Sequence, residues 1–155
     1  MFEDLRELYQ EVILDHGKNP RNFRHPEDAN REAVGHNPMC GDQLVVYLKV
    51  SADKIVEDVA FQGKGCAISM ASASMMTEIL KGKTEEQAHT LFQAFHKLCA
   101  GEDEDASVPA ELEDDFERLM VLAGVREFPV RVKCATLAWH TMEAATAGED
   151  EITTE

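Results

Sequence analysis

The sequence has no long run of hydrophobic residues, although hydrophobic residues make up 44% of its 155 positions. A helix that spans a bilayer needs about 20 consecutive, mainly apolar residues, and no stretch approaches that length. The first residues, MFEDLRELYQEV, are amphipathic and acidic, whereas a secretory signal has a basic segment followed by an apolar one. We therefore expect a cytoplasmic protein without a membrane partner.

Basic residues are also scarce, because 15 Lys and Arg stand against 30 Asp and Glu and give a formal net charge of -15. Nucleic acids and anionic membranes repel such a chain, so we expect no nucleic-acid partner. Part of the acidity is concentrated in residues 101–117 and in a C-terminal tail, residues 149–155. We interpret both segments as solvated surface, with an acidic docking face or adaptation to high salt as alternatives.

Cysteine is sparse as well, with four residues in the chain. Small disulfide-stabilised proteins have a much higher cysteine content, and a reducing compartment keeps thiols unpaired. Catalysis, metal binding and simple burial therefore remain as the uses of these four cysteines.

Hydrophobic periodicity predicts the helices and strands of the chain. Apolar residues at helical spacing indicate helices, and alternation of apolar and polar residues indicates strands. Thr84, with Gln87 three residues later, is typical of a capping box at a helix start. The expected helices are residues 3–16, 66–81, 85–99, 109–123 and 133–147, with an extended link at 126–133. The expected strands are 31–37, 42–50 and 54–63.

This order of elements, one helix, a small sheet and then further helices, indicates an α+β fold. We expect an antiparallel sheet of about three strands with helices packed on one side. The length of the chain is that of one ordinary domain, and the sequence contains neither an internal repeat nor a linker. We therefore expect one domain over residues 1–155.

Three of the cysteines occupy special positions in this arrangement. Cys40 and Asp42 lie on the turn that leads into the strand 42–50. Cys66 lies where a strand ends and a helix begins, and Cys134 lies at the expected start of the last helix. Unpaired N–H groups at a helix N-terminus favour the thiolate over the thiol.

The neighbours of these cysteines also suit a binding site. Lys64 and Lys133 stand one or two residues before two of the thiols in the sequence and add positive charge. Glycine permits the left-handed or closely approaching backbone that a loop around an ion often needs. Such glycines stand at positions 41, 63 and 65.

Cys40, Asp42, Cys66 and Cys134 could together provide a tetrahedral set of ligands for zinc, which accepts both thiolates and carboxylates. No CxxC pair is present, so the spacing alone does not prove convergence. The alternative is that the cysteines are small hydrophobic residues of the core. We interpret Cys99, which ends an apolar helix face, in that structural way.

The histidines are less suggestive of a site. We interpret them as surface or packing residues rather than ligands, and His36 is the best exception because it is close in sequence to Cys40. His16, His25 and His36 lie on or beside loops, His89 and His96 on one helix edge, and His140 follows Cys134 in the last helix.

Four segments of the chain carry a family resemblance. They are LYQEVILDHGKNPRNF (8–23), NPMCGDQL (37–44), FQGKGCAISMASASMM (61–76) and VKCATLAWHTM (132–142). Together they resemble the U-type iron–sulfur cluster assembly family, which comprises IscU, the N-terminal domain of NifU and SufU. The resemblance extends from residue 5 to about residue 145 and implies a SufE/NifU-like fold.

Two details resemble the SufU branch of that family. Scaffold-type IscU proteins have a histidine immediately before their last cysteine, and this chain has Lys133 there. SufU-like members carry an insertion between the helix that follows the second cysteine and the last helix. Residues 82–129 are long and contain two helical patterns, so we expect a helical insertion there.

The resemblance implies a zinc-dependent sulfurtransferase. SufU-like proteins bind Zn²⁺ through three cysteines and an aspartate, accept persulfide sulfur from the PLP-dependent cysteine desulfurase SufS, and pass it to the Suf cluster-assembly proteins. Carried over, Cys40 is the catalytic sulfur acceptor, and Cys40, Asp42, Cys66 and Cys134 are the metal ligands.

Two other functions remain open on the same residues. A scaffold would build a transient iron–sulfur cluster on the thiolates, and an interaction module would hold zinc for structure only. Lys133 favours sulfur transfer over the scaffold. The turns that carry the motifs, which we expect to be exposed, favour it over structural zinc.

Overall fold

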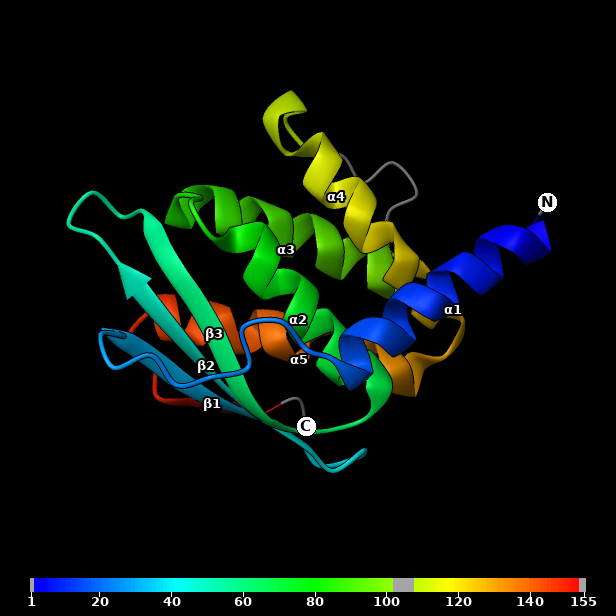
Figure 1. The fold of residues 1–155 in the computed structure, drawn as a ribbon, viewed down its shortest axis with the longest axis horizontal. Helices are drawn as coiled ribbons and strands as arrows, with labels where there is room; N and C mark the ends of the chain where they lie inside the picture. Colours follow the sequence, from blue (N-terminus) through cyan, green and yellow to red (C-terminus); the bar gives the residue numbers. More distant parts are fainter. Residues whose placement is uncertain (1, 102–107, 154–155) are drawn as a thin grey trace.

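The computed structural model describes residues 2–101 and 108–153, with side chains from residue 9 onward. Helices and strands follow one another in the α+β order that the sequence predicts (Figure 1). The elements are α1 (Phe2–Lys18), β1 (Arg31–Asn37), β2 (Asp42–Val50), β3 (Val56–Lys64), α2 (Ala67–Leu80), α3 (Glu85–Ala100), the 3-10 helix η1 (Ala110–Leu112), α4 (Glu113–Leu119), the 3-10 helix η2 (Met120–Glu127), α5 (Pro129–Thr146) and β4 (Glu151–Thr153).

The sheet has four strands in the order β3-β2-β1-β4, and it is mixed. The strands β1, β2 and β3 pair antiparallel, as predicted. The strand β4 pairs parallel with β1, where Val34 donates a hydrogen bond from its N–H to the carbonyl of Asp150. The three predicted strands are thus confirmed, and the structure adds β4, because a strand of three residues is too short to show an alternating pattern.

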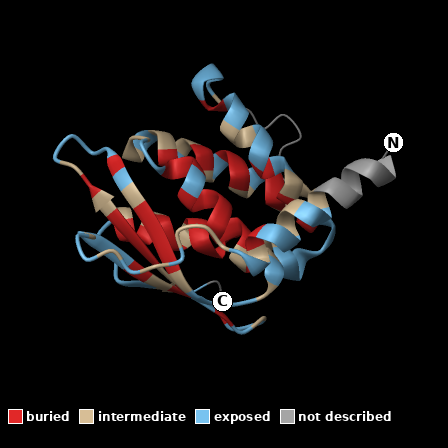
Figure 2. Ribbon diagram, viewed as in Figure 1, coloured by how far each residue is buried: buried red, intermediate tan, exposed pale blue. Residues whose placement is uncertain are grey.

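Helices α2 and α5 pack on one face of the sheet, as expected, and α3 packs on α5 (Figure 1). Buried residues line the facing sides of the sheet and these helices, as Figure 2 shows. The largest fully buried side chains include Trp139, Phe61 and Phe95, which come from α5, β3 and α3. This core packs α5 against the sheet and so positions the ends of β1, β3 and α5.

The last helix begins earlier than the sequence predicts. An extended link was expected over residues 126–133, but α5 starts at Pro129, which occupies the first helical position. Proline fits there because the first N–H groups of a helix have no partner within the helix. The prediction of an extended link was therefore wrong, because all of its residues except Phe128 lie in η2 or α5.

The segment 82–129 is largely helical where it is described. The helix α3 begins with the predicted capping box of Thr84 and Gln87. The single helix expected over residues 109–123 is instead divided among η1, α4 and η2, which extend to residue 127. That this segment is an insertion relative to other proteins stays a prediction.

The acidic segments are described only in part. Residues 102–107 and 154–155 lie outside the described residues. Glu111, Glu113 and Asp114 are exposed, in agreement with solvated surface. Among the described residues, no helix combines the length and apolarity needed to cross a membrane.

Candidate metal centre

The turn between β1 and β2, the junction of β3 with α2 and the first turns of α5 meet at one end of the molecule (Figure 1). There the sulfur atoms of Cys40 and Cys134, which are far apart in the sequence, lie 3.1 Å from each other. One ligand atom from each of Cys40, Asp42 and Cys134 falls within 4.8 Å of the other two. The fold thus brings together three of the four predicted ligands.

Asp42 is buried at the base of this group, with a relative exposure of 2%. It is the first residue of β2 and pairs in register with Asn37, the last residue of β1. The Asn37 side chain donates a hydrogen bond from Nδ2 to Asp42 Oδ2 at 3.0 Å, and its distance to Cys134 Sγ is 3.4 Å. Sequence reasoning missed Asn37, which holds two of the predicted ligands together.

Cys66 is next to the group but does not complete it. It is the N-cap residue of α2, as expected from the strand-to-helix junction, and its backbone N–H donates to Asp42 Oδ1 at 2.9 Å. Its thiol contributes to the raised pKa of Cys134, which places it beside that residue. Its sulfur is nevertheless outside the three-residue group, so Cys66 as a ligand stays a prediction.

Cys134 lies deeper than the sequence suggests. Because α5 starts at Pro129, Cys134 lies in the second turn, and the argument from free N–H groups does not apply to it. Burial raises the pKa of its thiol, and hydrogen bonds with Cys40 and Asp42 raise it further. A bound cation would reverse this effect, because positive charge favours the thiolate.

Arg131, which sequence reasoning also missed, contributes positive charge beside the thiols. Its Nη1 lies 4.0 Å from Cys134 Sγ. The interaction with Cys134 raises the pKa of Arg131, and the charges of Cys66 and Cys40 add to that effect. Its position three residues before Cys134 on one helix was the available signal, because residues at this spacing share a face.

The backbone around the group leaves little room for side chains. Gly41 has a φ of 72°, a left-handed conformation that suits glycine. A Cβ added to Gly65 would lie 2.6 Å from Asp42 Oδ1. These two glycines have the roles that the sequence predicts, because they let the chain turn tightly around the carboxylate.

The chemistry of the donor set fits zinc. Two thiol sulfurs and a carboxylate within one small space are ligands that zinc accepts, with Cys66 as the nearest candidate for a fourth. The buried hydroxyl of Ser69 has no hydrogen-bond partner among the described residues and would lie 3.2 Å from a Cβ on Gly65. An unpaired polar group beside Asp42 indicates that the site is incomplete without a further partner.

An open hollow of about 670 Å³ lies over the thiols, and neither Lys64 nor Lys133 lines it. Asp42 and Cys134 are buried, whereas Cys40 and Cys66 are half-buried. The lining residues are Met39, Cys40, Cys66, Phe128, Val130 and Arg131. Three of them are large hydrophobic residues exposed to solvent, namely Met39, Phe128 and Val130.

The fourth cysteine lies apart from this centre. Cys99 is buried in the hydrophobic core, as the sequence predicts, and burial raises its pKa to about 12. Among the histidines, His36 has its Nε2 2.9 Å from Glu151 of β4. His16, expected beside a loop, is buried on α1 and hydrogen-bonded to Ser74.

The family model for the NifU-like N-terminal domain matches residues 8–135. The chain belongs to that family. This NifU-like domain is 43% identical over 147 residues to the zinc-dependent sulfurtransferase SufU of Bacillus subtilis (strain 168), covering 95% of each chain. It is 41% identical over 142 residues to the iron–sulfur cluster assembly scaffold protein IscU of Streptococcus pyogenes serotype M1, covering 91% of this chain and 84% of the relative.

A solved structure supports the same relationship. A protein of Fervidobacterium islandicum AW-1, named as a candidate iron–sulfur cluster assembly scaffold for the SUF system, superimposes with a TM-score of 0.78 at 33% identity. The match covers 90% of this chain and 96% of that one. The NifU-like domain is thus a member of the family of SufU and IscU cluster-assembly proteins, as the four sequence segments indicate.

Proposed function

We propose that this NifU-like domain is a zinc-dependent sulfurtransferase of iron–sulfur cluster biogenesis. It would accept persulfide sulfur from a PLP-dependent cysteine desulfurase of the SufS type and pass it to the Suf cluster-assembly proteins. The observation that carries the proposal is the unequal exposure of the site. Cys40 lines an open hollow, whereas Cys134 and Asp42 are buried behind it.

Asp42, Cys40 and Cys134 would hold the zinc ion, with Cys66 as the fourth ligand. Zinc supplies positive charge that keeps the coordinated sulfurs deprotonated at neutral pH. Asp42 is fixed by Asn37 and by the N–H of Cys66, so the carboxylate is held ready in place. A structural zinc site is closed by its ligands, whereas this one is open on the side of Cys40.

The transfer itself is a thiol exchange without net oxidation. The Cys40 thiolate attacks the terminal sulfur of the desulfurase persulfide, a bond forms between these two sulfurs, and the bond within the persulfide breaks. The desulfurase cysteine leaves as a thiolate, and Cys40 carries the persulfide. Arg131 lies where it can stabilise the negative charge of the sulfurs.

The rim of the hollow suits contact with another protein. Met39, Phe128 and Val130 have relative exposures of 67%, 61% and 48%. Exposed apolar side chains around a reactive group are typical of an interface, because they release water when a partner covers them. A desulfurase that covers this rim would bring its persulfide to Cys40.

The scaffold function remains the second candidate. The Streptococcus pyogenes relative is named a scaffold, and two clustered thiols with a third beside them can also hold iron. Lys133 favours sulfur transfer, because the resemblance to scaffold-type IscU requires a histidine there. A coloured cluster that passes to an apo-ferredoxin would support the scaffold instead.

The first prediction concerns Cys40 as the sulfur acceptor. In the proposed reaction, Cys40→Ala removes the attacking sulfur, so sulfur transfer from a SufS-type desulfurase falls to background. Radiolabelled sulfur on the protein and sulfide release measure the transfer, and metal analysis measures zinc. Cys99→Ala is the matched control, because Cys99 is buried away from the hollow and should leave transfer unchanged. Labelling of Cys40→Ala at the wild-type level would contradict the assignment of Cys40 as the sulfur acceptor.

A further inference from the structure

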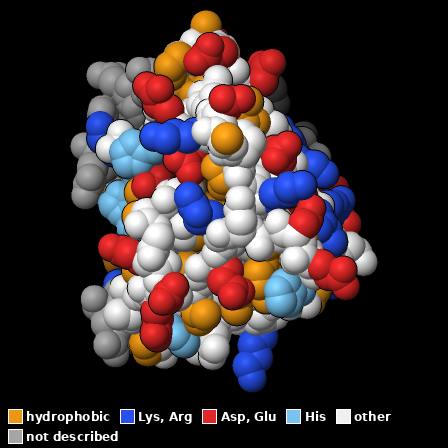
Figure 3. Space-filling view, turned by 90° about the vertical axis from the view of Figure 1, so that its left-hand side faces the viewer, with side chains coloured by type: hydrophobic (Ala, Val, Ile, Leu, Met, Phe, Trp, Pro, Cys, Tyr) orange, Lys and Arg blue, Asp and Glu red, His pale blue; other side chains and the backbone are white. Residues whose placement is uncertain are grey.

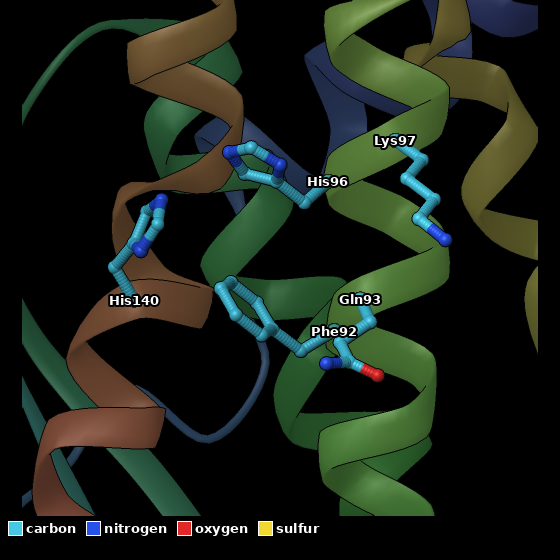
Figure 4. A pocket seen from close by; sticks show the side chains of 5 residues that line it. All are labelled: Phe92, Gln93, His96, Lys97 and His140. Carbon is cyan, nitrogen blue, oxygen red and sulfur yellow. The ribbon is translucent and has the colours of Figure 1, made fainter. Parts of the chain in front are cut away.

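A pair of histidines faces across the groove between two packed helices, apart from the cysteine centre. His96 lies on α3 and His140 on α5. Their ring centroids are 5.4 Å apart, and the ring planes cross at 83°. Figure 4 shows the two side chains reaching toward one another from the two helices.

Phe92 packs against both imidazoles and fixes their positions. Its ring centroid is 5.0 Å from that of His140 and 6.0 Å from that of His96. Beneath them, Phe95 and Trp139 join the same two helices in the core, with ring centroids 5.2 Å apart. Two ligands on rigid elements lose little conformational entropy when they bind, which favours chelation.

The surroundings favour a neutral imidazole at His140, with a free position beside the two rings. Burial, and secondarily the charge of His96, lower the pKa of His140, so its ring is neutral at physiological pH. A hollow of about 340 Å³ opens over the pair and is lined by Phe92, Gln93, His96, Lys97 and His140. In Figure 4 the Lys97 side chain extends away from the two rings.

We propose that His96 and His140 form a second site, which binds a borderline divalent transition-metal ion such as Ni²⁺ or Zn²⁺. Neutral imidazoles suit zinc, nickel and copper, whereas magnesium and calcium prefer oxygen ligands, and none of the described residues that line this hollow carries a carboxylate. The hollow is open, so water or a group from another molecule completes the coordination. His140 follows Cys134 by six positions, which span about 9 Å of helix, so the two sites are separate.

The test uses the intact protein loaded with one equivalent of zinc, which the thiolates of the cysteine centre bind first, followed by titration with Ni²⁺. The imidazole signals of all histidines are followed by NMR, and the affinity is measured by calorimetry. Paramagnetic Ni²⁺ should broaden the signals of His96 and His140 together, before those of the other histidines. His96→Gln should weaken binding at least about tenfold, because the chelate effect of the second ligand is lost.

His89→Gln is the matched control, because His89 is an exposed histidine on the same helix and pairs with Glu143 rather than with the two rings. It should leave the Ni²⁺ affinity unchanged. The proposal is overturned if the signals of His96 and His140 do not broaden together, or if His96→Gln binds Ni²⁺ as tightly as the wild type. His140→Gln repeats the test from the other helix, and the wild-type NMR result does not depend on how either variant folds.

Discussion

At the scale of single residues, the site depends on a few side chains that hold the ligands rather than on the ligands alone. Asn37 donates to Asp42 and approaches Cys134, and the N–H of Cys66 donates to the other carboxylate oxygen. Partners of this kind orient ligands and are often nearly as important as the ligands themselves. The single asparagine therefore offers a direct test of the centre.

Asn37→Ala should weaken zinc binding about 10- to 100-fold, because Asp42 loses a donor that fixes its orientation. Competition with a chromogenic zinc chelator measures the affinity. Asn30→Ala is the matched control, since Asn30 bonds to both backbone groups of Val50 on β2. This control should destabilise the fold and leave the zinc affinity unchanged. Equal zinc affinities of Asn37→Ala and the wild type would contradict the assigned role of Asn37.

At the scale of elements, the sequence correctly predicted the start of helix α3, which is marked by a capping box. The hydroxyl of Thr84 accepts from the N–H of Gln87, and the Gln87 side chain accepts from the N–H of Thr84, both at 3.0 Å. Four residues suffice to specify this arrangement. The start of α5 at Pro129 was not predicted, because proline starts some helices and ends others, and only the neighbouring structure decides between the two.

Thr84→Ala should lower the free energy of unfolding by about 1 kcal/mol, because the first turn of α3 loses its cap. Urea unfolding of the zinc-saturated protein measures the change. Gln87→Ala removes the other half of the box, and the double variant should lose less than the sum of the single losses, because the two bonds are coupled. Strict additivity would show that the two residues act separately.

At the scale of the whole molecule, the net charge of -15 reflects an excess of acidic residues, but these residues do not form an unbroken acidic surface on the face shown in Figure 3. On that face, Asp and Glu side chains lie among Lys and Arg side chains.

Helix α1 is joined to helix α2 by a hydrogen bond between His16 and Ser74, in which His16 Nδ1 lies 2.7 Å from Ser74 Oγ. Burial lowers the pKa of His16, and the charge of Arg21 adds to the effect.

The lowered pKa of His16 predicts that the protein loses stability in acid. In the unfolded chain, His16 takes up a proton near the ordinary pKa of histidine, whereas in the folded protein it does so only at lower pH. The free energy of unfolding therefore falls as the pH drops through that range. Urea unfolding from about pH 7.5 to about pH 5.5 should show this loss. His16→Asn, compared in the same metal state, should show a weaker dependence on pH. An identical dependence in both proteins would exclude His16 as the cause.

The sequence by itself determined the order of the elements, the α+β class and the candidate ligands, because periodicity, turn residues and capping are local properties. These local patterns place Cys40, Asp42 and Cys66 at the ends of strands and helices. The chemistry of these residues and Cys134 suggested one zinc site, and the family segments supported it.

Only the tertiary structure decided which atoms meet. The contact of Cys40 with Cys134, the bridging position of Asn37 and the pairing of β4 with β1 join parts of the chain that no local pattern connects. The same holds for His96 and His140, which lie on separate helices. Packing of α5 against the sheet and α3 produces these contacts, because the burial of apolar side chains fixes the helix positions and so brings distant polar groups together.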